Sequence, residues 1–169
     1  MSKPFVAVIM GSDSDLPTMQ ATLDTLSSLQ VDWEVKITSA HRTPEVTHTY
    51  VRDAEQRGCV VFIAAAGLAA HLAGTVASLT LKPVIGVPME AGPLNGQDAL
   101  FSTVQMPGGI PVACVAIGKA GAKNAAYLAA QIASLSDADI AKRLADDRKA
   151  NAAEIIEKDR QLQQRTSGE

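Results

Sequence analysis

The chain of 169 residues is most simply one domain, so we expect residues 1–169 to form a single α/β unit. Hydrophobic residues make up 47% of the sequence and aromatic residues only 4%, which predicts a sizeable core of small, closely packed side chains. The net charge of −3 argues against nucleic acid or an anionic membrane surface as the main partner. Any anionic ligand must therefore be held by a local site.

The amino-terminal stretch MSKPFVAVIMGS has a short apolar run and then a turn, so no signal peptide is expected. No stretch reaches the roughly 18 apolar residues of a membrane span, and we expect a cytoplasmic protein. Cys59 and Cys114 lie in or beside apolar runs, with no His or second Cys at metal-ligand spacing. They are predicted to be buried, reduced thiols, and no metal site is expected.

Five short apolar runs are spaced along the chain, as in parallel strands that are buried on both faces. They are residues 5–10, 31–38, 60–65, 83–87 and 112–117. Helical patterns lie between them. Alternating strands and helices predict an α/β fold with right-handed crossovers and helices on both faces of a parallel sheet.

The first two helices are predicted from their end signals and their apolar spacing. Thr43 is expected to cap a helix that has Pro44 at its first position and Gly58 just beyond its end. The apolar stripes are Leu16, Met19, Leu23 and Leu26 in one helix, and Val46, Tyr50, Val51 and Ala54 in the next.

A long, highly charged helix is predicted as a carboxyl-terminal extension, about residues 136–162, to a core of about residues 4–135. Ser136 is its expected N-cap. Its apolar stripe consists of Ile140, Leu144, Ile155 and Ile156. Because little of the sheet is left to cover, this stripe should either fold back on its own domain or reach a neighbouring subunit.

Three loops that follow strands carry unusual chemistry, and such loops gather at the carboxyl edge of a parallel sheet, where ligands bind. In the first, GSDSD at residues 11–15, Ser12 and Ser14 bring hydroxyls to the start of a helix, which suits a phosphate. Gly11 permits a sharp turn there, and Asp15 can accept hydrogen bonds from a ribose diol. The alternative is a helix cap made by Ser14 or Asp15.

The second loop, SAHRTP at residues 39–44, places His41 beside Arg42. An arginine at a helix start is unfavourable to the helix dipole, but its guanidinium can bind a phosphate in a bidentate fork. His41 is the expected proton carrier, because imidazole changes its charge near neutral pH. The alternatives are a solvated arginine and a hydrogen-bonded histidine at a strand end.

The third loop, AAAGLAAHLAG at residues 64–74, is made of small residues that leave the backbone exposed, so a flat ring can lie against it. His71 sits within it. The alternative is a tight helix–sheet contact with His71 as a helix cap. Together the three loops indicate proton transfer on a nucleotide-like phosphate ester.

In this order, the motifs GSDSD, SAHRTP, AAGLAAHLAG and VQMPGGIPVACVAIGKAGAKNAA closely resemble the family of bacterial N5-carboxyaminoimidazole ribonucleotide mutases of purine biosynthesis, over residues 4–150. The resemblance implies a flavodoxin-like three-layer sandwich with a five-stranded parallel sheet. It also implies a homo-octamer in which the carboxyl-terminal helix packs on neighbouring subunits. The implied substrate is an imidazole ribonucleotide, the implied pathway neighbour is N5-carboxyaminoimidazole ribonucleotide synthetase, and neither a metal nor an organic cofactor is implied.

The resemblance also assigns roles to individual residues. His41 matches the catalytic histidine, which would move a proton between the carbamate nitrogen and a ring carbon as the carboxylate is transferred. Arg42 matches the phosphate-binding arginine, and Ser12 and Asp15 match substrate-binding positions, with Asp15 on the ribose. Further substrate contacts are expected from Ser14, Ser39, Gly67, His71 and Leu72.

Three alternatives to a mutase are open. The nearest is the related carboxylase that adds free carbon dioxide directly to aminoimidazole ribonucleotide, although AAHLAG in the third loop favours the mutase. The second is a flavodoxin-like flavin-binding module without catalysis, against which the scarcity of aromatic residues argues. The third, a protein with only a structural role in assembly, would leave the SAHRTP loop unexplained.

Overall fold

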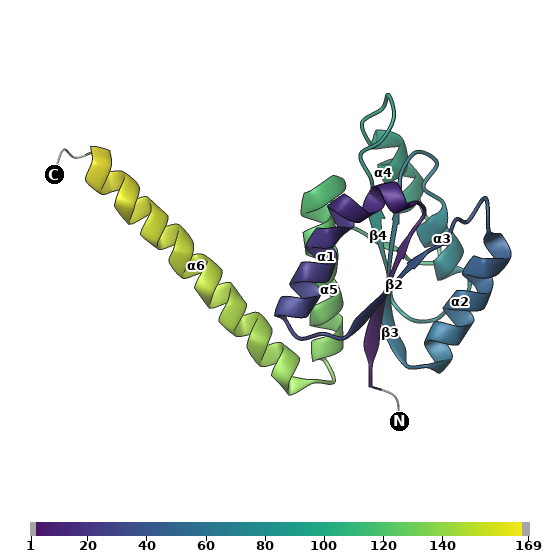
Figure 1. Cartoon of the computed structure of the whole chain (residues 1–169), viewed down its shortest axis with the longest axis horizontal. Helices are drawn as coiled ribbons and strands as arrows, with labels where there is room; N and C mark the ends of the chain where they lie inside the picture. The colour runs from purple at the N-terminus through teal and green to yellow at the C-terminus, as the bar shows by residue number, and fades with distance from the viewer. Residues whose placement is uncertain (1–2, 167–169) are drawn as a thin grey trace.

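A five-stranded parallel sheet forms the centre of the computed structural model, which describes residues 3–166 (Figure 1). Its strands are β1 (Phe5–Met10), β2 (Trp33–Ile37), β3 (Cys59–Ala66), β4 (Val84–Pro88) and β5 (Ala113–Cys114). They lie in the order β2-β1-β3-β4-β5, which is the flavodoxin-like doubly wound order. The predicted fold class is confirmed, although β5 is much shorter than its apolar run.

Helices cover both faces of the sheet and make the three-layer arrangement visible in Figure 1. α1 (Leu16–Ser28) and α5 (Gly118–Ser134) lie on one face, and α2 (Pro44–Gln56) and α3 (Leu72–Ala77) lie on the other. The remaining helices are η1 (Asp13–Asp15), α4 (Gln97–Val104) and α6 (Ala138–Thr166). None of the helices in the described part of the chain has the length and apolar character needed to cross a membrane.

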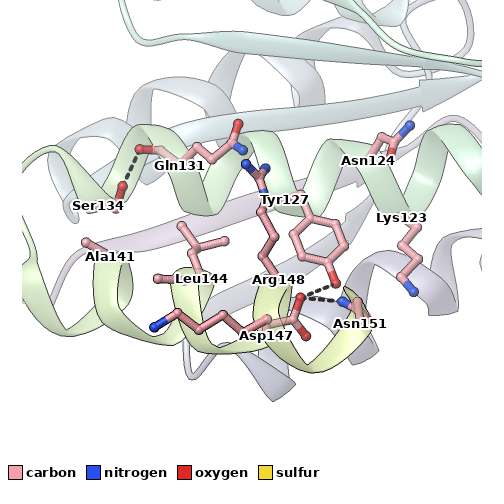
Figure 2. A pocket seen from close by; sticks show the side chains of 12 residues that line it. Lys123, Asn124, Tyr127, Gln131, Ser134, Ala141, Leu144, Asp147, Arg148 and Asn151 are labelled. Atoms are coloured by element: carbon pink, nitrogen blue, oxygen red, sulfur yellow. Dashed lines mark hydrogen bonds between the residues drawn. The ribbon is translucent and has the colours of Figure 1, made fainter. Parts of the chain in front are cut away.

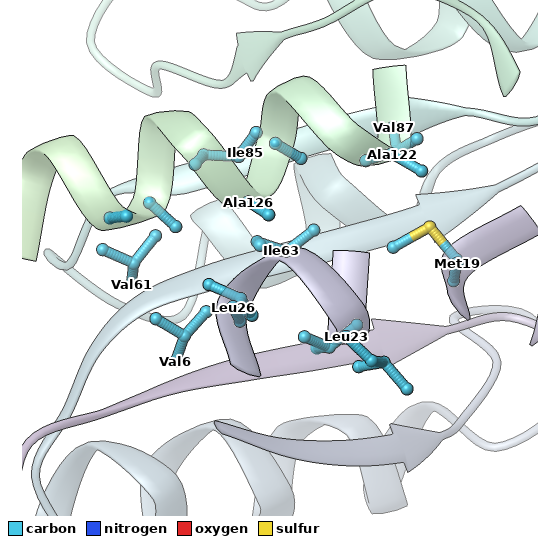
Figure 3. Close-up of a cluster of buried hydrophobic side chains, with 14 of the residues drawn as sticks. Val6, Met19, Leu23, Leu26, Val61, Ile63, Ile85, Val87, Ala122 and Ala126 are labelled. Carbon is cyan, nitrogen blue, oxygen red and sulfur yellow. The ribbon is translucent and has the colours of Figure 1, made fainter. Parts of the chain in front are cut away.

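The strand pleat divides the core into two clusters. Val6 and Val8 face α1 and α5, whereas Ala7 and Ile9 face α2 and α3. A row of fully buried alanines lets α5 lie close on the sheet: Ala122, Ala125, Ala126, Ala129 and Ala130. Figure 3 shows Ala122 and Ala126 beside the strand residues Ile63 and Ile85. The core is therefore built by close approach of small side chains, as the composition predicts.

The start of α2 differs from the prediction in one respect. Pro44 is its first residue, Thr43 precedes it, and Gly58 follows its end with a φ of +100°, all as expected. The Thr43 side chain, however, makes no capping bond to the helix. Its hydroxyl instead accepts the backbone N–H of Ser39 at 2.9 Å, because the loop before the helix folds back over it.

The predicted apolar stripes are buried only in part. In α1, Met19, Leu23 and Leu26 are buried in the core, but Leu16 at the helix start is exposed. In α2, Val46 is likewise exposed. Both exposed residues lie in the first turn of their helix.

The cap of α6 lies one residue beyond the predicted Ser136. The Asp137 carboxylate accepts the backbone N–H groups of Asp139 and Ile140 at 2.9 and 3.1 Å. The prediction of Ser136 is therefore wrong, because the carboxylate of Asp137 can reach both free amides of the first turn.

Most of α6 extends away from the body as an arm (Figure 1). Near its start, Ile140 is buried and Leu144 is half-buried against the first core cluster. Further along, Ile155 and Ile156 are 65% and 70% exposed. The apolar stripe thus folds back on its own domain only over its first two turns.

Candidate active site

A cavity of about 520 Å³ lies at the carboxyl ends of β1, β2 and β3. Since β2 and β3 lie on opposite sides of β1, this is the point where the strand order reverses and where doubly wound proteins bind ligands. Every residue that the sequence predicted for the site lines the cavity: Ser12, Ser14, Asp15, Ser39, His41, Arg42, Gly67, His71 and Leu72. The structure brings them together, and their individual roles stay predictions.

The two histidines of the cavity contact each other directly. His41 follows β2 and His71 immediately precedes α3, yet Nε2 of His41 lies 2.8 Å from Nδ1 of His71. The ring planes are 81° apart, in an edge-to-face arrangement. One nitrogen must donate and the other accept, so the contact couples the tautomers of the two rings. His71 occupies the N-cap position of α3, as the alternative expected, but its side chain makes no capping bond to the helix.

Arg42 joins the first two loops. Its Nη2 donates to the carbonyl oxygen of Gly11 at 3.1 Å, and its backbone N–H donates to Oγ of Ser39 at 3.2 Å. A guanidinium has five N–H donors, and the bond to Gly11 uses one. The exposed head group can therefore still bind an oxyanion in a bidentate fork while Gly11 fixes its position.

Serine hydroxyls organise the first loop. Oγ of Ser12 accepts the backbone N–H of Ser14 at 3.3 Å and the Ser14 hydroxyl at 2.9 Å. Ser12 is therefore the capping residue, whereas Ser14 and Asp15 were the predicted alternatives. Because the backbone N–H of Ser14 is bonded within the loop, it is not free to donate to a phosphate. Gly11 is not in the left-handed region, so this turn does not require a glycine.

Asp15 is half-buried in the cavity wall. Burial raises the pKa of its carboxyl above the ordinary value, the backbone hydrogen bond from Ser12 opposes this, and the charge of Asp13 adds to the rise. A partly desolvated carboxylate gains more from a hydrogen-bond donor than one in water. Asp15 is therefore well suited to accept the hydroxyls of a sugar.

Small apolar residues complete the wall of the cavity: Ala40, Ala66, Leu68, Ala69 and Ala91. Ala91, in the loop after β4, lines the cavity although it was not predicted to. Leu68 has a φ of +55°, in the left-handed region that non-glycine residues rarely adopt. Gly92 has a φ of +65°, and a Cβ added there would lie 2.6 Å from Cδ2 of Leu68, so a larger residue at 92 would displace the Leu68 side chain. No aromatic ring that could stack on a flavin is among the lining residues in the described chain.

The two cysteines lie outside the cavity. Cys59 is buried, and burial raises the pKa of its thiol to about 12. Cys114 is half-buried, and burial raises its pKa as well. Both are free thiols, as predicted, although Cys114 is less buried than expected. Between residues 3 and 166, no three His, Cys, Asp or Glu side chains are grouped so as to hold a metal ion.

A larger concave surface, about 1010 Å³, lies between α5 and α6 (Figure 2). Tyr127 and Asn151 both donate to the Asp147 carboxylate there, at 2.8 Å. None of the predicted site residues lines it. It is formed by two diverging helices and carries no histidine. We therefore place the candidate active site in the smaller cavity, which His41, Arg42 and Asp15 line together.

The fold and this cavity define a doubly wound α/β protein with a ligand site at the reversal of its strand order. A sequence model of the AIR carboxylase family matches residues 5–154, and the chain belongs to this family. It is 50% identical over 161 residues to the N5-carboxyaminoimidazole ribonucleotide mutase of Thermotoga maritima, which covers 95% of this chain and 93% of that protein. It is 51% identical over 152 residues to the protein of the same name from Escherichia coli K12, covering 90% of each.

The fold is also found among solved structures. The crystal structure of Treponema denticola PurE superimposes with a TM-score of 0.85 and 33% sequence identity. The match covers 95% of this chain and 99% of that one. Fold and family therefore agree over nearly the whole chain.

Proposed function

We propose that this chain is an N5-carboxyaminoimidazole ribonucleotide mutase, an isomerase that forms 4-carboxy-5-aminoimidazole ribonucleotide in purine biosynthesis. The observation that supports this most is the meeting of His41, Arg42 and Asp15 in one cavity of a chain that is 50% identical to a protein of that name. The reaction moves a carboxylate from the exocyclic nitrogen to a ring carbon, so it needs groups that position the ribonucleotide and carry one proton.

Binding begins with the phosphate. Arg42 pairs with it, and the hydroxyls of Ser12, Ser14 and Ser39 donate to its oxygens. Asp15 accepts the ribose hydroxyls. The imidazole ring lies against the third loop, where Gly67 and Leu72 are placed to contact it and His71 lies beside His41.

His41 carries out the proton transfer. Protonated His41 gives its proton to the exocyclic nitrogen as the carbamate C–N bond breaks and carbon dioxide leaves. The ring carbon then attacks the trapped carbon dioxide, and neutral His41 removes the proton from that carbon, which restores aromaticity. The proton given in the first step returns in the second. The wall of small apolar residues excludes water and keeps the gas near the ring.

The test is an assay of the purified protein with each candidate substrate. A mutase forms product from N5-carboxyaminoimidazole ribonucleotide without added bicarbonate. Product formed only from aminoimidazole ribonucleotide with bicarbonate would instead identify the direct carboxylase and overturn the proposal. A yellow protein with no turnover would point to the flavin-binding alternative.

The proposal includes a homo-octamer of single-domain chains, in which α6 packs on neighbouring subunits. The exposed Ile155 and Ile156 support it, because burying each side chain is worth about 1.5–3 kcal/mol. The proposal also includes a cytoplasmic location, N5-carboxyaminoimidazole ribonucleotide synthetase as the pathway neighbour, and catalysis without a metal or an organic cofactor.

A further inference from the structure

A connected set of threonine hydroxyls lies at the base of the loop that carries His41 and Arg42. Thr38 directly follows β2, Thr43 directly precedes α2, and Thr47 lies in the first turn of α2. Oγ1 of Thr38 lies 3.0 Å from Oγ1 of Thr43 and 2.9 Å from Oγ1 of Thr47. Thr38 and Thr47 are only 3% and 0% exposed. The three hydroxyls therefore join the end of a strand to the start of a helix inside the protein.

The contact from Thr47 goes beyond what its helix requires. A threonine in a helix commonly donates to the carbonyl four residues back, and Oγ1 of Thr47 has such a contact with the carbonyl of Thr43 at 3.3 Å. The contact with Thr38 is shorter, at 2.9 Å, and crosses to another element. Its effect is to tie α2 to the last residue that pairs with the sheet, since the N–H of Thr38 donates to the carbonyl of Met10.

The other end of the network holds the loop itself. Oγ1 of Thr43 accepts the N–H of Ser39 at 2.9 Å, and the N–H of Thr43 donates to the carbonyl of Ser39 at 2.9 Å. Oγ of Ser39 in turn accepts the N–H of Arg42. The segment 39–42 is therefore closed by bonds between Ser39 and Thr43, and the Thr43 hydroxyl is in turn held by the buried hydroxyl of Thr38.

We propose that Thr47 is a positioning residue, whose hydroxyl holds the loop that presents His41 and Arg42 to the substrate. It acts through Thr38 and Thr43 and does not itself line the cavity. The inference rests on the proposed function, which gives His41 and Arg42 their tasks. Because a displacement of about 1 Å can cost about 100-fold in rate, a small shift of this loop is enough to impair catalysis.

The chain offers a matched control on the opposite face of the sheet. Thr22 is also 0% exposed, and its Oγ1 donates to the carbonyl of Ala122 at 2.7 Å, which joins α1 to α5. Thr22→Val and Thr47→Val each remove one buried hydroxyl and keep the side-chain shape. Only Thr47→Val removes a hydroxyl from the threonine network at the base of the His41 loop.

The experiment compares Thr47→Val, Thr47→Ser and Thr22→Val in the full-length protein. We expect both valine variants to lower the melting temperature by similar amounts, because each loses a buried side-chain hydrogen bond. Only Thr47→Val should lower kcat, by about 10- to 100-fold, and weaken the binding of ribose 5-phosphate measured by calorimetry. Thr47→Ser keeps the hydroxyl and should recover most of both losses.

Parental kcat and parental ribose 5-phosphate affinity in Thr47→Val would overturn the inference, as would an equal loss of kcat in Thr22→Val. If Thr47→Val does not fold, Thr38→Val removes the shared hydroxyl and carries the same expectation. A parent protein that binds ribose 5-phosphate without mutase activity would refute the proposed function alone, since the binding comparison still tests Thr47. A parent protein that neither binds ribose 5-phosphate nor shows mutase activity would refute both the proposed function and the role of Thr47.

Discussion

The hydrogen bond between His41 and His71 limits how a substrate proton can reach His41. Nε2 of His41 is engaged by His71, so a substrate must either use Nδ1 of His41 or compete with His71 for Nε2. Neutral imidazole has one donor and one acceptor nitrogen, so whether Nδ1 of His71 donates or accepts also decides which nitrogen of His41 carries the proton. In the proposed mechanism, proton transfer by His41 would therefore depend on both rings of the pair.

We expect His41→Asn to keep the fold and much of the ligand affinity but to lose at least about 100-fold in kcat, because acid–base catalysis is removed. Steady-state kinetics of the purified variant measure this. His48→Asn is the matched control, since His48 lies on α2 outside the cavity and should leave turnover unchanged. Near-normal turnover in His41→Asn would remove this residue from the mechanism.

For Arg42→Ala, we expect weaker binding of phosphorylated ligands by about 10- to 100-fold, the cost of a lost hydrogen bond to a charged group. Calorimetry with aminoimidazole ribonucleotide and with its nucleoside separates the phosphate contribution, because only the first ligand should lose affinity. Arg52→Ala, on the exposed side of α2, is the control. Equal losses for both ligands would contradict the phosphate assignment.

Asp15→Asn should raise stability while it harms binding. Burial raises the pKa of Asp15, so the folded state holds this proton more tightly than the unfolded state, and stability falls as the pH rises from 3.8 through the raised value. At pH 7 the charged carboxylate therefore costs stability, and the amide removes that cost. Thermal unfolding should show a gain at pH 7 that shrinks toward pH 3.8, and calorimetry should show weaker preference for ribose over deoxyribose 5-phosphate. A lower melting temperature at pH 7 would contradict this account.

Among the elements, α2 is the one whose placement matters most for the site, and a polar network ties it to the edge strand β2. Arg57 donates to both carboxylate oxygens of Glu34, at 2.6 and 2.7 Å, and to Asp53 at 2.7 Å. The Tyr50 hydroxyl donates to Glu34 at 2.6 Å. Since β2 has a neighbour on one side only, this network adds a second attachment between the strand and the helix that flank the His41 loop.

We expect Glu34→Gln to flatten the acid dependence of stability. The hydrogen bond from Arg57, more than that from Tyr50, lowers the pKa of Glu34. The stabilisation is therefore full above the ordinary value of 4.5 and is lost as the pH falls through the lowered value. Urea unfolding at pH 7 and pH 3 should show a smaller difference in the variant than in the parent. At pH 7 the loss should stay below about 1 kcal/mol, because the pair is largely exposed. Equal differences in both proteins would show that the pair does not carry this dependence.

On the scale of the whole molecule, the α6 arm is the part whose side chains the rest of the chain does not bury. From residue 148 to residue 166 every described side chain is exposed except Glu157, which is intermediate. The groove between α5 and α6 opens where the arm leaves the body (Figure 2). An isolated charged helix in water gains little from propensity alone, so most of its stability must come from packing.

Truncation after Leu135 should give smaller, less stable particles by light scattering, because the apolar stripe of α6 would no longer bury surface between subunits. Activity should fall as well if subunit contacts complete the site. A milder test of the same prediction replaces both Ile155 and Ile156 by serine. The control variant replaces both Gln163 and Gln164 by serine. A truncated protein that remained octameric and fully active would show that α6 has no role in assembly.

The sequence alone determined the architecture and the position of the site. Strands buried on both faces are apolar throughout, so β1 and β3 could be predicted from their apolar runs. The helical segments between the strands then predict a parallel sheet. Parallel strands point their carboxyl ends to one edge, so the loops with Asp15, His41 and His71 had to lie near one another. These inferences rest on periodicity and chain direction, which are local properties.

Tertiary structure decided everything that depends on a distance between segments. His41 and His71 are 30 residues apart, and only the placement of β2 and β3 on either side of β1 brings Nε2 of His41 to 2.8 Å from Nδ1 of His71. The same holds for the bond from Arg42 to Gly11 and for the hydroxyl of Thr43, which serves its loop although its position suggested a helix cap. A side chain with several possible partners chooses among them by geometry, and that geometry exists only after the core has packed.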